Sequence, residues 1–351
     1  METVTVNTAS ASYPVHIGPG LLDETGALAA GVTGSRTCAV VTDSNVEPLY
    51  AARVCRSLQN VGFTVRLHVF PAGEQSKNLP VFGEILEFFA RNQLTRSDLA
   101  AALGGGVTGD MAGFAAAAYQ RGIDYIQIPT TFLAASDSSV GGKTAIDLAA
   151  GKNLAGAFHQ PRLVVCDTDT FRTLPEEAFA DGAAETLKHG LIADRDFYRF
   201  LMSEDIHARI DQVVRRNVEI KAAVVGEDEK EHGRRKLLNF GHTLGHAIEK
   251  VSGFAVTHGH AVAVGMVLAS RAAVRLGHSP AGTLQEVQSA CRRLGLPVEC
   301  PYTAGQLFAA ATADKKRDGG NIDVVVLEEI GRAKTVRLDM EGLRSFAEAA
   351  L

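Results

Sequence analysis

The sequence has no tryptophan and no apolar run that approaches about 18 residues, the length that a membrane helix needs. It also lacks a long basic run, and its formal net charge is −5. We therefore expect neither a membrane nor a nucleic acid as a partner. The N-terminal residues lack the charged and then apolar leader of a signal peptide, so we expect none. There are no internal repeats and no low-complexity segment.

Cysteines are few and scattered. The five are Cys38, Cys55, Cys166, Cys291 and Cys300, an odd number without a Cys-x-x-Cys pair. This usage favours a reduced, cytoplasmic setting. The chain is 46% hydrophobic and 21% charged, as in an ordinary globular protein. Its 351 residues are more than usually fold around a single hydrophobic core, so we expect two domains.

The first half alternates strand and helix patterns, which predicts an α/β domain over residues 1–174 with a mostly parallel, Rossmann-like sheet. From about residue 175 the apolar period is mostly helical, which predicts an all-α domain over residues 175–351. A hairpin is expected in its tail at 322–338. The expected strands are 3–6, 13–17, 37–41, 64–69, 99–103, 125–128 and 163–165, and the main expected helices are 48–60, 81–92, 111–119, 206–225, 234–251 and 261–276.

One expected helix carries a polar stripe where a soluble helix normally carries an apolar one. Arg235, Asn239, His242, His246 and Glu249 follow one another at steps of 4, 3, 4 and 3, which places them on one face of a continuous helix. Two histidines at i and i+4 can both bind one metal ion, or one can bind metal while the other moves protons. The alternative is a solvated polar face.

A carboxylate completes a candidate metal set. Glu185 lies three residues before Lys188 on a short expected helix. One carboxylate and two histidines form a common catalytic zinc set that leaves room for substrate or water. Glu185 and His242 are the first two candidate ligands. The third is His258 or His260, and spacing alone does not choose between them.

A strand runs into the glycine-rich segment Gly104–Asp110, which formally matches G-x-G-x-x-G and precedes an expected helix. Such loops let a backbone approach a pyrophosphate at a helix N-terminus. The acidic residue that usually follows about 20 positions later is missing. Asp43, at the end of an upstream strand, is therefore the candidate for the ribose hydroxyls, with a turn cap as its alternative role.

Further glycine-flanked segments follow other strands: Gly73–Lys77, Pro129–Thr131, Asp137–Thr144 and Gly151–Asn153. Doubly wound sheets place their ligand loops at the carboxyl ends of strands. Cations accompany these segments in an acidic protein, and they suit a small, multiply anionic substrate such as a sugar phosphate. They are Arg121, Lys143, Lys152, Lys188, Lys221, Arg235 and Lys316.

Taken together, these segments resemble the 3-dehydroquinate synthase family. The matching segments appear in family order over about residues 40–320: GEQSK at 73–77, GGGVTGD at 104–110, PTT at 129–131, DSSVGGK at 137–143, GKN at 151–153, AETLK at 184–188, DEKE at 228–231, LNFGHTLGH at 238–246 and DKK at 314–316.

The resemblance implies an N-terminal NAD-binding domain, a C-terminal helical metal- and substrate-binding domain, an active site between them, and a homodimer. It also implies a reaction. A seven-carbon keto-sugar acid phosphate loses phosphate and closes to 3-dehydroquinate. NAD oxidises a substrate hydroxyl transiently, β-elimination releases phosphate, and re-reduction, ring opening and aldol closure follow. The implied cofactors are NAD+ and Zn²⁺ or Co²⁺.

The same resemblance assigns roles to residues. It gives Glu185, His242 and His258 to the metal, with His258 chosen by the family's His-Gly-x-Ala-Val pattern, and makes His246 the proton shuttle. The implied catalytic set is His246, Lys143, Lys188, Asp137 and Glu231. The implied NAD set is Asp43, Gly73, Glu74, Lys77, Gly105, Gly106, Val107, Thr108, Gly109, Asp110, Thr130, Thr131, Lys143, Lys152, Thr170, Phe171, Arg172 and Thr173. The implied substrate set is Arg121, Asp137, Lys143, Asn153, Lys188, Lys221, Arg235, Asn239, His246 and Lys316.

The sequence departs from the family pattern at two positions and is compatible with other functions. His189 and His260 stand where many family members carry Tyr and Glu, and either Lys315 or Lys316 could face the substrate. Another sugar-phosphate cyclase, such as 2-deoxy-scyllo-inosose synthase or a valiolone-type synthase, would share the metal and NAD. A metal-dependent polyol dehydrogenase or a non-catalytic NAD- or metal-binding regulator are further alternatives. The lysines of 314–316 with Asn239 and Arg121 favour a substrate that has an acid group.

Overall fold

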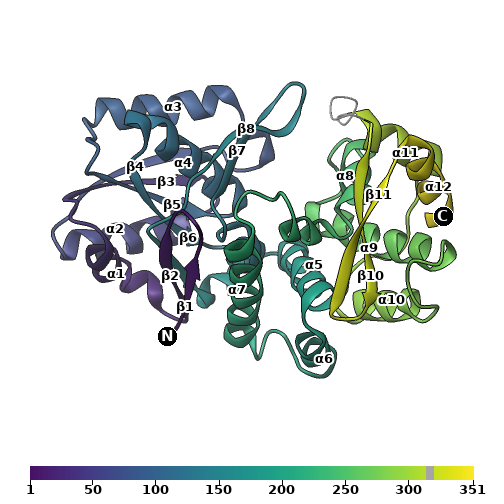
Figure 1. Cartoon of the computed structure of the whole chain (residues 1–351). Helices are drawn as coiled ribbons and strands as arrows, with labels where there is room; N and C mark the ends of the chain where they lie inside the picture. Colours follow the sequence, from purple (N-terminus) through teal and green to yellow (C-terminus); the bar gives the residue numbers. More distant parts are fainter. Residues whose placement is uncertain (314–319) are drawn as a thin grey trace. The chain divides into compact units, whose positions relative to one another are not determined.

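The computed structural model describes residues 1–313 and 320–351, so Lys315 and Lys316 lie outside the described residues. The chain divides into two units. The first unit consists of Met1–Leu174 and Ile210–Glu229, and the second unit of Pro175–Arg209 and Lys230–Leu351 (Figure 1). The predicted division at residue 174 differs from this in one segment, since 210–229 groups with the first unit.

A seven-stranded sheet forms the centre of the first unit, in the order β1-β2-β9-β6-β5-β3-β4. β1 and β2 pair antiparallel, whereas the other neighbours pair parallel, as predicted. The strands are β1 (Glu2–Asn7), β2 (Ser12–Gly18), β3 (Thr37–Asp43), β4 (Thr64–Phe70), β5 (Leu99–Gly104), β6 (Asp124–Pro129) and β9 (Leu163–Asp167).

Helices cover both faces of this sheet, which explains why its inner strands are apolar throughout. On β3, Cys38 and Val40 pack into one core, while Ala39 and Val41 pack into another. α1 (Thr25–Val32) and α2 (Ala52–Asn60) contribute to the first core, and α3 (Leu79–Arg91) and α4 (Gly106–Ala118) to the second. Alternate side chains of a strand point to opposite faces, so each core takes every second residue.

Short helical turns connect these elements. They are η1 (Leu21–Asp23), η2 (Glu47–Ala51), η3 (Glu74–Ser76), η4 (Tyr119–Arg121), η5 (Ala134–Ser138) and η6 (Thr168–Thr173). α4 begins at Gly106, inside the glycine-rich segment, rather than at Met111 as predicted.

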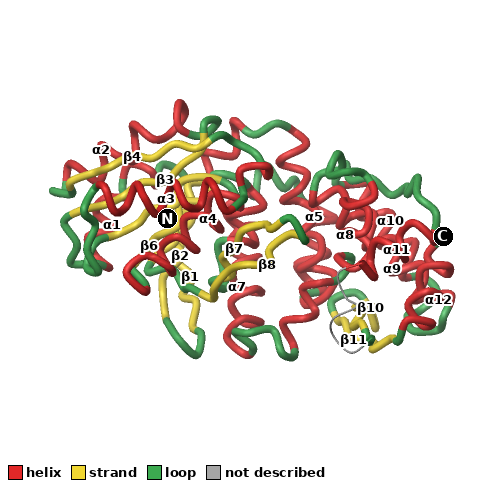
Figure 2. The backbone as a smooth tube through the Cα atoms, turned by 90° about the horizontal axis from the view of Figure 1, so that it is seen from above, coloured by secondary structure: helices red, strands yellow, loops and turns green. Residues whose placement is uncertain are grey.

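A separate antiparallel hairpin of β7 (Lys143–Leu148) and β8 (Gly151–Phe158) lies outside the main sheet (Figure 2). The sequence predicted glycine-flanked loops here and missed both strands. Thr144 and Ile146 on one face of β7 are buried, whereas Lys143 is exposed. The hairpin therefore packs one face against its own unit.

α7 (Ile210–Glu227) belongs to the first unit because its side chains bind there. Nζ of Lys221 lies 2.7 Å from Oδ1 of Asp137, and Nε of Arg215 lies 2.9 Å from Oε2 of Glu2. Its apolar residues Val214 and Val218 are fully buried. A sequence pattern shows that this helix has a buried face but not which partner covers it.

The second unit is mainly helical, as predicted. Its helices are α5 (Glu176–Ala193), α6 (Arg195–Ser203), η7 (Arg234–Asn239), α8 (His242–Val251), α9 (His258–Arg275), α10 (Thr283–Arg293), α11 (Ala304–Ala313) and α12 (Met340–Ala350). It also holds the expected tail hairpin, formed by β10 (Ile322–Glu329) and β11 (Arg332–Leu338) around Gly331. No helix among the described residues is both long and apolar enough to cross a membrane.

The predicted continuous helix over 234–251 is wrong. The chain forms η7, breaks at Phe240-Gly241, and then forms α8. Gly241 has a φ of +81°, in the left-handed region that favours glycine. A Cβ there would lie 2.6 Å from Cγ of Met266. The helix therefore breaks where its backbone must approach α9, and Arg235 and Asn239 are not on the face that carries His242.

Candidate active site

Three side chains of the second unit converge on one point. Glu185 comes from the middle of α5, His242 from the first turn of α8 and His258 from the first turn of α9. Nε2 of His242 lies 3.5 Å and Nε2 of His258 lies 3.4 Å from Oε1 of Glu185. One ligand atom from each residue lies within 4.8 Å of the others. This is the arrangement of a three-ligand metal site.

The other nitrogens of the two imidazoles face acceptors. Nδ1 of His242 lies 3.2 Å from the carbonyl oxygen of Phe240, and Nδ1 of His258 lies 3.5 Å from Oε2 of Glu249. An acceptor at Nδ1 favours the tautomer that leaves Nε2 free of hydrogen, as is usual for histidines that bind metal, and His242 fits this pattern. His258 has a carboxylate near each nitrogen, Glu249 at Nδ1 and Glu185 at Nε2. Glu249 belongs to the predicted polar stripe, but no role was predicted for it. Its position seven residues after His242 places it on the face of the helix that carries the candidate ligand, and this spacing could have indicated its role beside the metal site.

The electrostatics of the cluster suit a cation. Glu185 is fully buried and pairs with the almost fully buried Lys188 one turn along α5. Burial lowers the pKa of His242 to about 3, which keeps its imidazole neutral and able to act as a ligand. Burial also disfavours the charged form of His258, but its hydrogen bonds with Glu185 and Glu249 outweigh this and raise its pKa. Such acidic surroundings attract positive charge.

Glycines bring the two histidine helices together. A Cβ on Gly265 of α9 would lie 2.1 Å from the carbonyl oxygen of Gly241 and 2.8 Å from the nitrogen of Gly245. A Cβ on Gly259 would lie 2.3 Å from Cα of Asp181 on α5. Helices α5, α8 and α9 therefore approach at backbone distance, which allows short side chains from all three to meet.

His260 has a different environment from His258. Its Nδ1 lies 3.0 Å from Oδ1 of Asp181, and its backbone N–H donates to the same oxygen at 3.1 Å. The hydroxyl of Thr257 also donates to that oxygen, at 2.7 Å. His260 is thus engaged with Asp181 and is not among the converging ligand atoms, so the geometry favours His258 for the third position.

His246 lies beside the cluster and is exposed. Its ring centre is 5.3 Å from that of His242, one turn earlier on α8, and 5.9 Å from that of His258. An exposed imidazole next to a metal site can exchange protons with solvent and with a bound molecule. The family resemblance gives the shuttle role to this residue, and that role stays a prediction.

The first unit gathers the predicted nucleotide residues at the carboxyl ends of its parallel strands. Asp43 ends β3, and its Oδ2 accepts a hydrogen bond from the Thr108 hydroxyl at 3.1 Å. Its Oδ1 caps the following turn by accepting from the N–H groups of Asn45 and Val46. Asp43 therefore has the predicted alternative role as a cap and also faces the start of α4.

The glycines at the start of α4 permit close approach. A Cβ on Gly105 would lie 3.1 Å from Cγ2 of Thr131, and one on Gly106 would lie 3.2 Å from Oγ of Ser138. No side chain caps this helix, and its first turn has no acidic residue. Its free N–H groups and its dipole suit a pyrophosphate. Gly105 thus precedes the helix, and Gly106–Asp110 lie at the start of α4 rather than in a loop.

Charged residues of three segments meet beside this helix. Nζ of the buried Lys77 lies 2.6 Å from Oδ2 of Asp110 and donates to Oδ1 of Asn153 at 2.6 Å. Nζ of Lys152 lies 3.4 Å from Oε1 of Glu74. The structure therefore joins residues predicted for NAD with Asn153, which was predicted for the substrate.

Other predicted residues of the first unit lie at the same edge. Thr130 and Thr131 follow β6, and Thr170, Phe171, Arg172 and Thr173 follow β9 in η6. The Thr131 hydroxyl accepts from the N–H of Ala134 at 3.1 Å. Lys221 binds Asp137 through both its carboxylate and its carbonyl oxygen. Two predicted substrate residues thus bind each other here.

Arg121 is the exception within the first unit. It lies in η4, between the end of α4 and the start of β6, and it is exposed with a φ of +68°. The amino ends of the parallel strands lie at the edge opposite the nucleotide loops. The structure therefore does not bring Arg121 to the other predicted residues of its unit.

The remaining predicted substrate residues lie in the second unit. Arg235, in η7, is almost fully buried, and Nδ2 of Asn239 donates to Oε1 of Glu231 at 2.6 Å. Glu231 has a φ of +62°. Asn239 and Glu231 thus form a pair, although the sequence had placed Asn239 on the histidine face.

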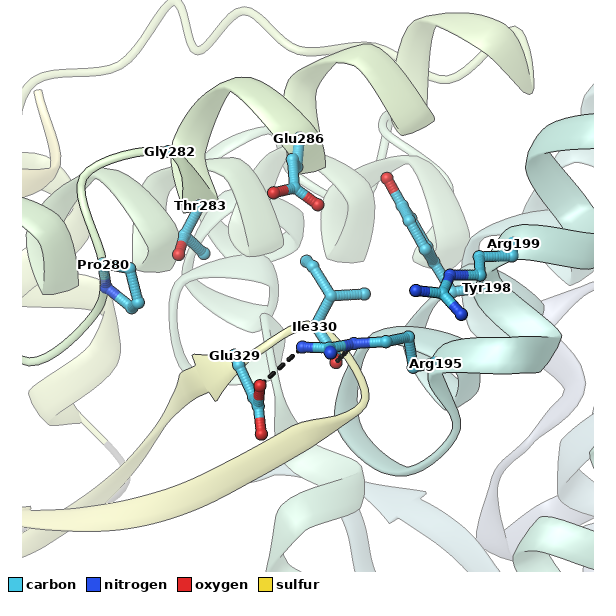
Figure 3. A pocket seen from close by; sticks show the side chains of 9 residues that line it. All are labelled: Arg195, Tyr198, Arg199, Pro280, Gly282, Thr283, Glu286, Glu329 and Ile330. Carbon is cyan, nitrogen blue, oxygen red and sulfur yellow. Dashed lines mark hydrogen bonds and ion pairs between the residues drawn. The ribbon is translucent and has the colours of Figure 1, made fainter.

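A cavity of about 300 Å³ lies elsewhere in the second unit, between α6, the start of α10 and the β10–β11 turn (Figure 3). None of the predicted site residues lines it. Its Arg195 is already engaged, since Nη2 lies 2.5 Å from Oε2 of Glu329 and Nε donates to the carbonyl of Ile330 at 3.0 Å. This cavity is not part of the candidate active site.

Solved structures with this architecture include 2-deoxy-scyllo-inosose synthase in complex with carbaglucose-6-phosphate, NAD+ and Co²⁺. It has a TM-score of 0.90 and 26% identity over 99% of both chains. A 2-epi-5-epi-valiolone synthase from Streptomyces hygroscopicus with NAD+ and Zn²⁺ bound has a TM-score of 0.85 and 28% identity over 96% of both chains. The fold is thus that of the sugar-phosphate cyclases.

Sequence comparisons identify one family among the sugar-phosphate cyclases. Residues 67–181 match the family model described as 3-dehydroquinate synthase N-terminal, and residues 182–317 match the C-terminal one. A 3-dehydroquinate synthase from Caulobacter vibrioides is 46% identical over 99% of this chain and 98% of its own length. The chain belongs to the 3-dehydroquinate synthase family.

Proposed function

We propose that the chain is a 3-dehydroquinate synthase, a carbon–oxygen lyase of the shikimate pathway, which leads to aromatic amino acids. It converts 3-deoxy-D-arabino-heptulosonate 7-phosphate to 3-dehydroquinate and inorganic phosphate. The observation that supports this best is the convergence of Glu185, His242 and His258 beside an exposed His246 in a chain of this family. A catalytic metal set with an adjacent proton carrier suits a lyase better than a binding module.

Two cofactors accompany this proposal. NAD+ supplies reversible hydride transfer, and a divalent ion, zinc or cobalt, supplies Lewis-acid polarisation of the hydroxyl that is oxidised. Asp43, the first turn of α4 and Lys77 would hold NAD+, because they combine a ribose acceptor with free N–H groups and a cation. Glu185, His242 and His258 would hold the metal.

The chain's own residues orient the substrate and move protons. His246 is exposed and lies one turn from a ligand, so it can accept a hydroxyl proton and return it. Lys188, Lys221 and Arg235 are buried cations that suit the carboxylate and phosphate. Lys143, Lys152 and Asn153 of the β7–β8 hairpin complete the proposed set, together with Asp137, Glu231, Asn239 and Lys316. Arg121 is left out of this set because it lies at the opposite edge of its sheet.

The proposal also covers the cellular location and the oligomeric state of the enzyme. We place it in the cytoplasm, because its scattered cysteines are unpaired in the described structure. A homodimer is what the family resemblance implies.

A substrate comparison tests the proposal. The purified chain with NAD+ and Zn²⁺ should release phosphate from 3-deoxy-D-arabino-heptulosonate 7-phosphate without accumulating NADH. Glucose 6-phosphate should not react. Turnover of glucose 6-phosphate alone would indicate a 2-deoxy-scyllo-inosose synthase, and net NADH formation from a polyol would indicate a dehydrogenase. Either result would replace the proposal.

A further inference from the structure

The β7–β8 hairpin carries an irregularity at Asp147. Ile146 pairs with Ala155, but the next pair towards the turn is Leu148 with Gly151. Asp147 alone therefore faces the three residues 152–154 on β8. A bulge of this kind extrudes residues from the ladder and re-aims their side chains, often beside active sites. Among the extruded residues are Lys152 and Asn153. The family resemblance assigns Lys152 to NAD and Asn153 to the substrate, and both belong to the proposed site.

Asp147 holds this bulge through two backbone contacts. Its Oδ1 accepts the N–H of Asn153 at 2.8 Å, and its own N–H donates to the carbonyl oxygen of Lys77 at 2.8 Å. Asn153 has a φ of +55°, a left-handed conformation that asparagine tolerates better than most side chains. The acceptor on Asp147 satisfies an N–H group that the bulge has removed from the ladder.

The bulge directs two side chains to the loop after β4. Oδ1 of Asn153 accepts from Nζ of Lys77 at 2.6 Å, and Nζ of Lys152 lies 3.4 Å from Oε1 of Glu74. In a regular hairpin, successive residues of β8 would point to opposite faces. Here the adjacent residues 152 and 153 both reach the Gly73–Lys77 segment, and the bulge is what permits this.

We infer that Asp147 is a positioning residue: it fixes the bulge that presents Lys152 and Asn153 to the nucleotide and the substrate. This inference rests on the proposed function, because Asp147 acts only through residues of that site. It requires a hydrogen-bond acceptor at position 147 rather than a negative charge. An asparagine side chain could supply that acceptor with little change in shape.

The test compares D147A and D147N with the wild type and with E87A. Glu87 is an exposed carboxylate on α3 that pairs only loosely with Arg91, at 3.9 Å, so it controls for loss of a surface charge. We expect D147A to lower kcat/KM for the substrate about tenfold, the cost of one lost hydrogen bond at a positioned group. D147N and E87A should stay within about twofold of the wild type.

Two readouts separate positioning from general destabilisation. The NAD+ dissociation constant of D147A, titrated without substrate, should rise several-fold while its bound metal is unchanged. Hydrogen exchange at the Asn153 amide should be faster in D147A and unchanged in D147N. If D147A does not fold, D147S serves instead, because its hydroxyl is too short to reach Asn153, and the same losses are expected.

Three results would overturn the inference. The first is unchanged kcat/KM and NAD+ affinity in D147A, and the second is a loss of kcat/KM in D147N as large as that in D147A. The third is an Asn153 amide that exchanges at the same rate in D147A as in D147N. A wild-type enzyme that fails to turn over 3-deoxy-D-arabino-heptulosonate 7-phosphate would instead remove the proposed function. The NAD+ titration and the exchange rates can still be read in that case, so the two failures are distinguishable.

Discussion

Nε2 of His258 lies 3.4 Å from Oε1 of Glu185, a carboxylate whose side chain is fully buried. The two residues lie far apart in the sequence, and they meet because Gly259 lets the start of α9 approach the backbone of α5. Lys188 offsets the charge of this buried carboxylate, and its two imidazole neighbours supply the further ligands that a divalent ion would need. The relationship therefore makes the metal content of the protein the first quantity to measure.

Replacing either imidazole of the cluster by alanine should abolish stable metal binding. We expect H258A and H242A to lose most of the bound metal, because two ligands hold a divalent ion far less well than three. H260A is the matched control, and it should keep about one ion per chain because His260 binds Asp181. Metal content by mass spectrometry after gel filtration is the measurement. Loss of metal in H260A with retention in H258A would reverse the assignment.

Replacing His246 should separate metal binding from turnover. H246A should retain metal and bind NAD+ normally, while kcat falls by roughly 10²- to 10⁴-fold, the usual contribution of a positioned proton carrier. Phosphate release measured alongside metal content checks this. A mutant with wild-type kcat would show that His246 carries no proton in the slow step.

A methyl group on Gly265 should disrupt the α8–α9 contact. Its Cβ would lie 2.1 Å from the carbonyl oxygen of Gly241, which is backbone and cannot rotate away. We expect G265A to lower the free energy of unfolding by about 2–4 kcal/mol and to weaken metal binding.

Gly305 of α11 provides the matched control for this substitution, because a Cβ at this position would have no neighbouring heavy atom within 4 Å. G305A should change stability by less than about 0.5 kcal/mol, because Gly305 is the second residue of α11 and the preference for alanine over glycine is strongest in a helix interior. Urea unfolding with metal present measures both. Equal stabilities for the two mutants would mean that the glycine contact does not set the helix spacing.

Removing the Lys77 ammonium should leave Asp110 without its ion-pair partner. The Lys77 side chain is 6% exposed and that of Asp110 is 20% exposed. We expect K77M to lower the free energy of unfolding by about 1–3 kcal/mol, and adding D110N should restore part of the loss. A double-mutant cycle in urea gives the coupling. Additive effects would mean that the pair contributes nothing to stability.

Glu229, at the end of the first unit, should make stability depend on pH. Burial alone would raise its pKa, but hydrogen bonds from Ser10 and from Nε2 of Gln160 lower it overall. A lowered folded pKa means that the contribution is complete above the unfolded pKa of about 4.3 and is lost as the pH falls through the folded pKa.

The stability difference between wild type and E229Q should therefore be largest near neutral pH and should shrink below about pH 4. Urea midpoints from pH 3 to pH 7 measure it, and E87Q is the control that should show no such trend. A difference that stays constant over this range would contradict the lowered pKa.

Much of the first unit was predictable because its signals are local. Buried parallel strands are apolar runs, and the turns after them carry the glycines and charges that ligand loops need. That is why the strands around Asp43, Gly104 and Pro129 were placed correctly. The β7–β8 hairpin was missed because its glycines at 141, 142 and 151 indicate loops, whereas its strands are partly exposed and lack the apolar run of a buried sheet strand.

Other features depended on contacts between distant residues. The break at Gly241 follows from the approach of Met266 and Val262, which no local pattern contains. The place of α7 depends on partners such as Asp137 and Glu2, more than 70 residues away. The environments of His258 and His260 differ through Asp181 on α5, which no spacing along the sequence connects with either histidine. Short periodic signals identify the element, and long-range packing decides its partner.

We expect the Glu185–His242–His258 cluster to bind a metal ion on which conversion of the sugar-acid phosphate depends. The most direct measurement is phosphate release by the wild-type enzyme with NAD+ before chelation, after exhaustive chelation, and after addition of Zn²⁺ or Co²⁺. We predict that chelation abolishes release and that about one equivalent of either ion restores it. Full phosphate release from protein shown to contain no divalent ion would contradict the account.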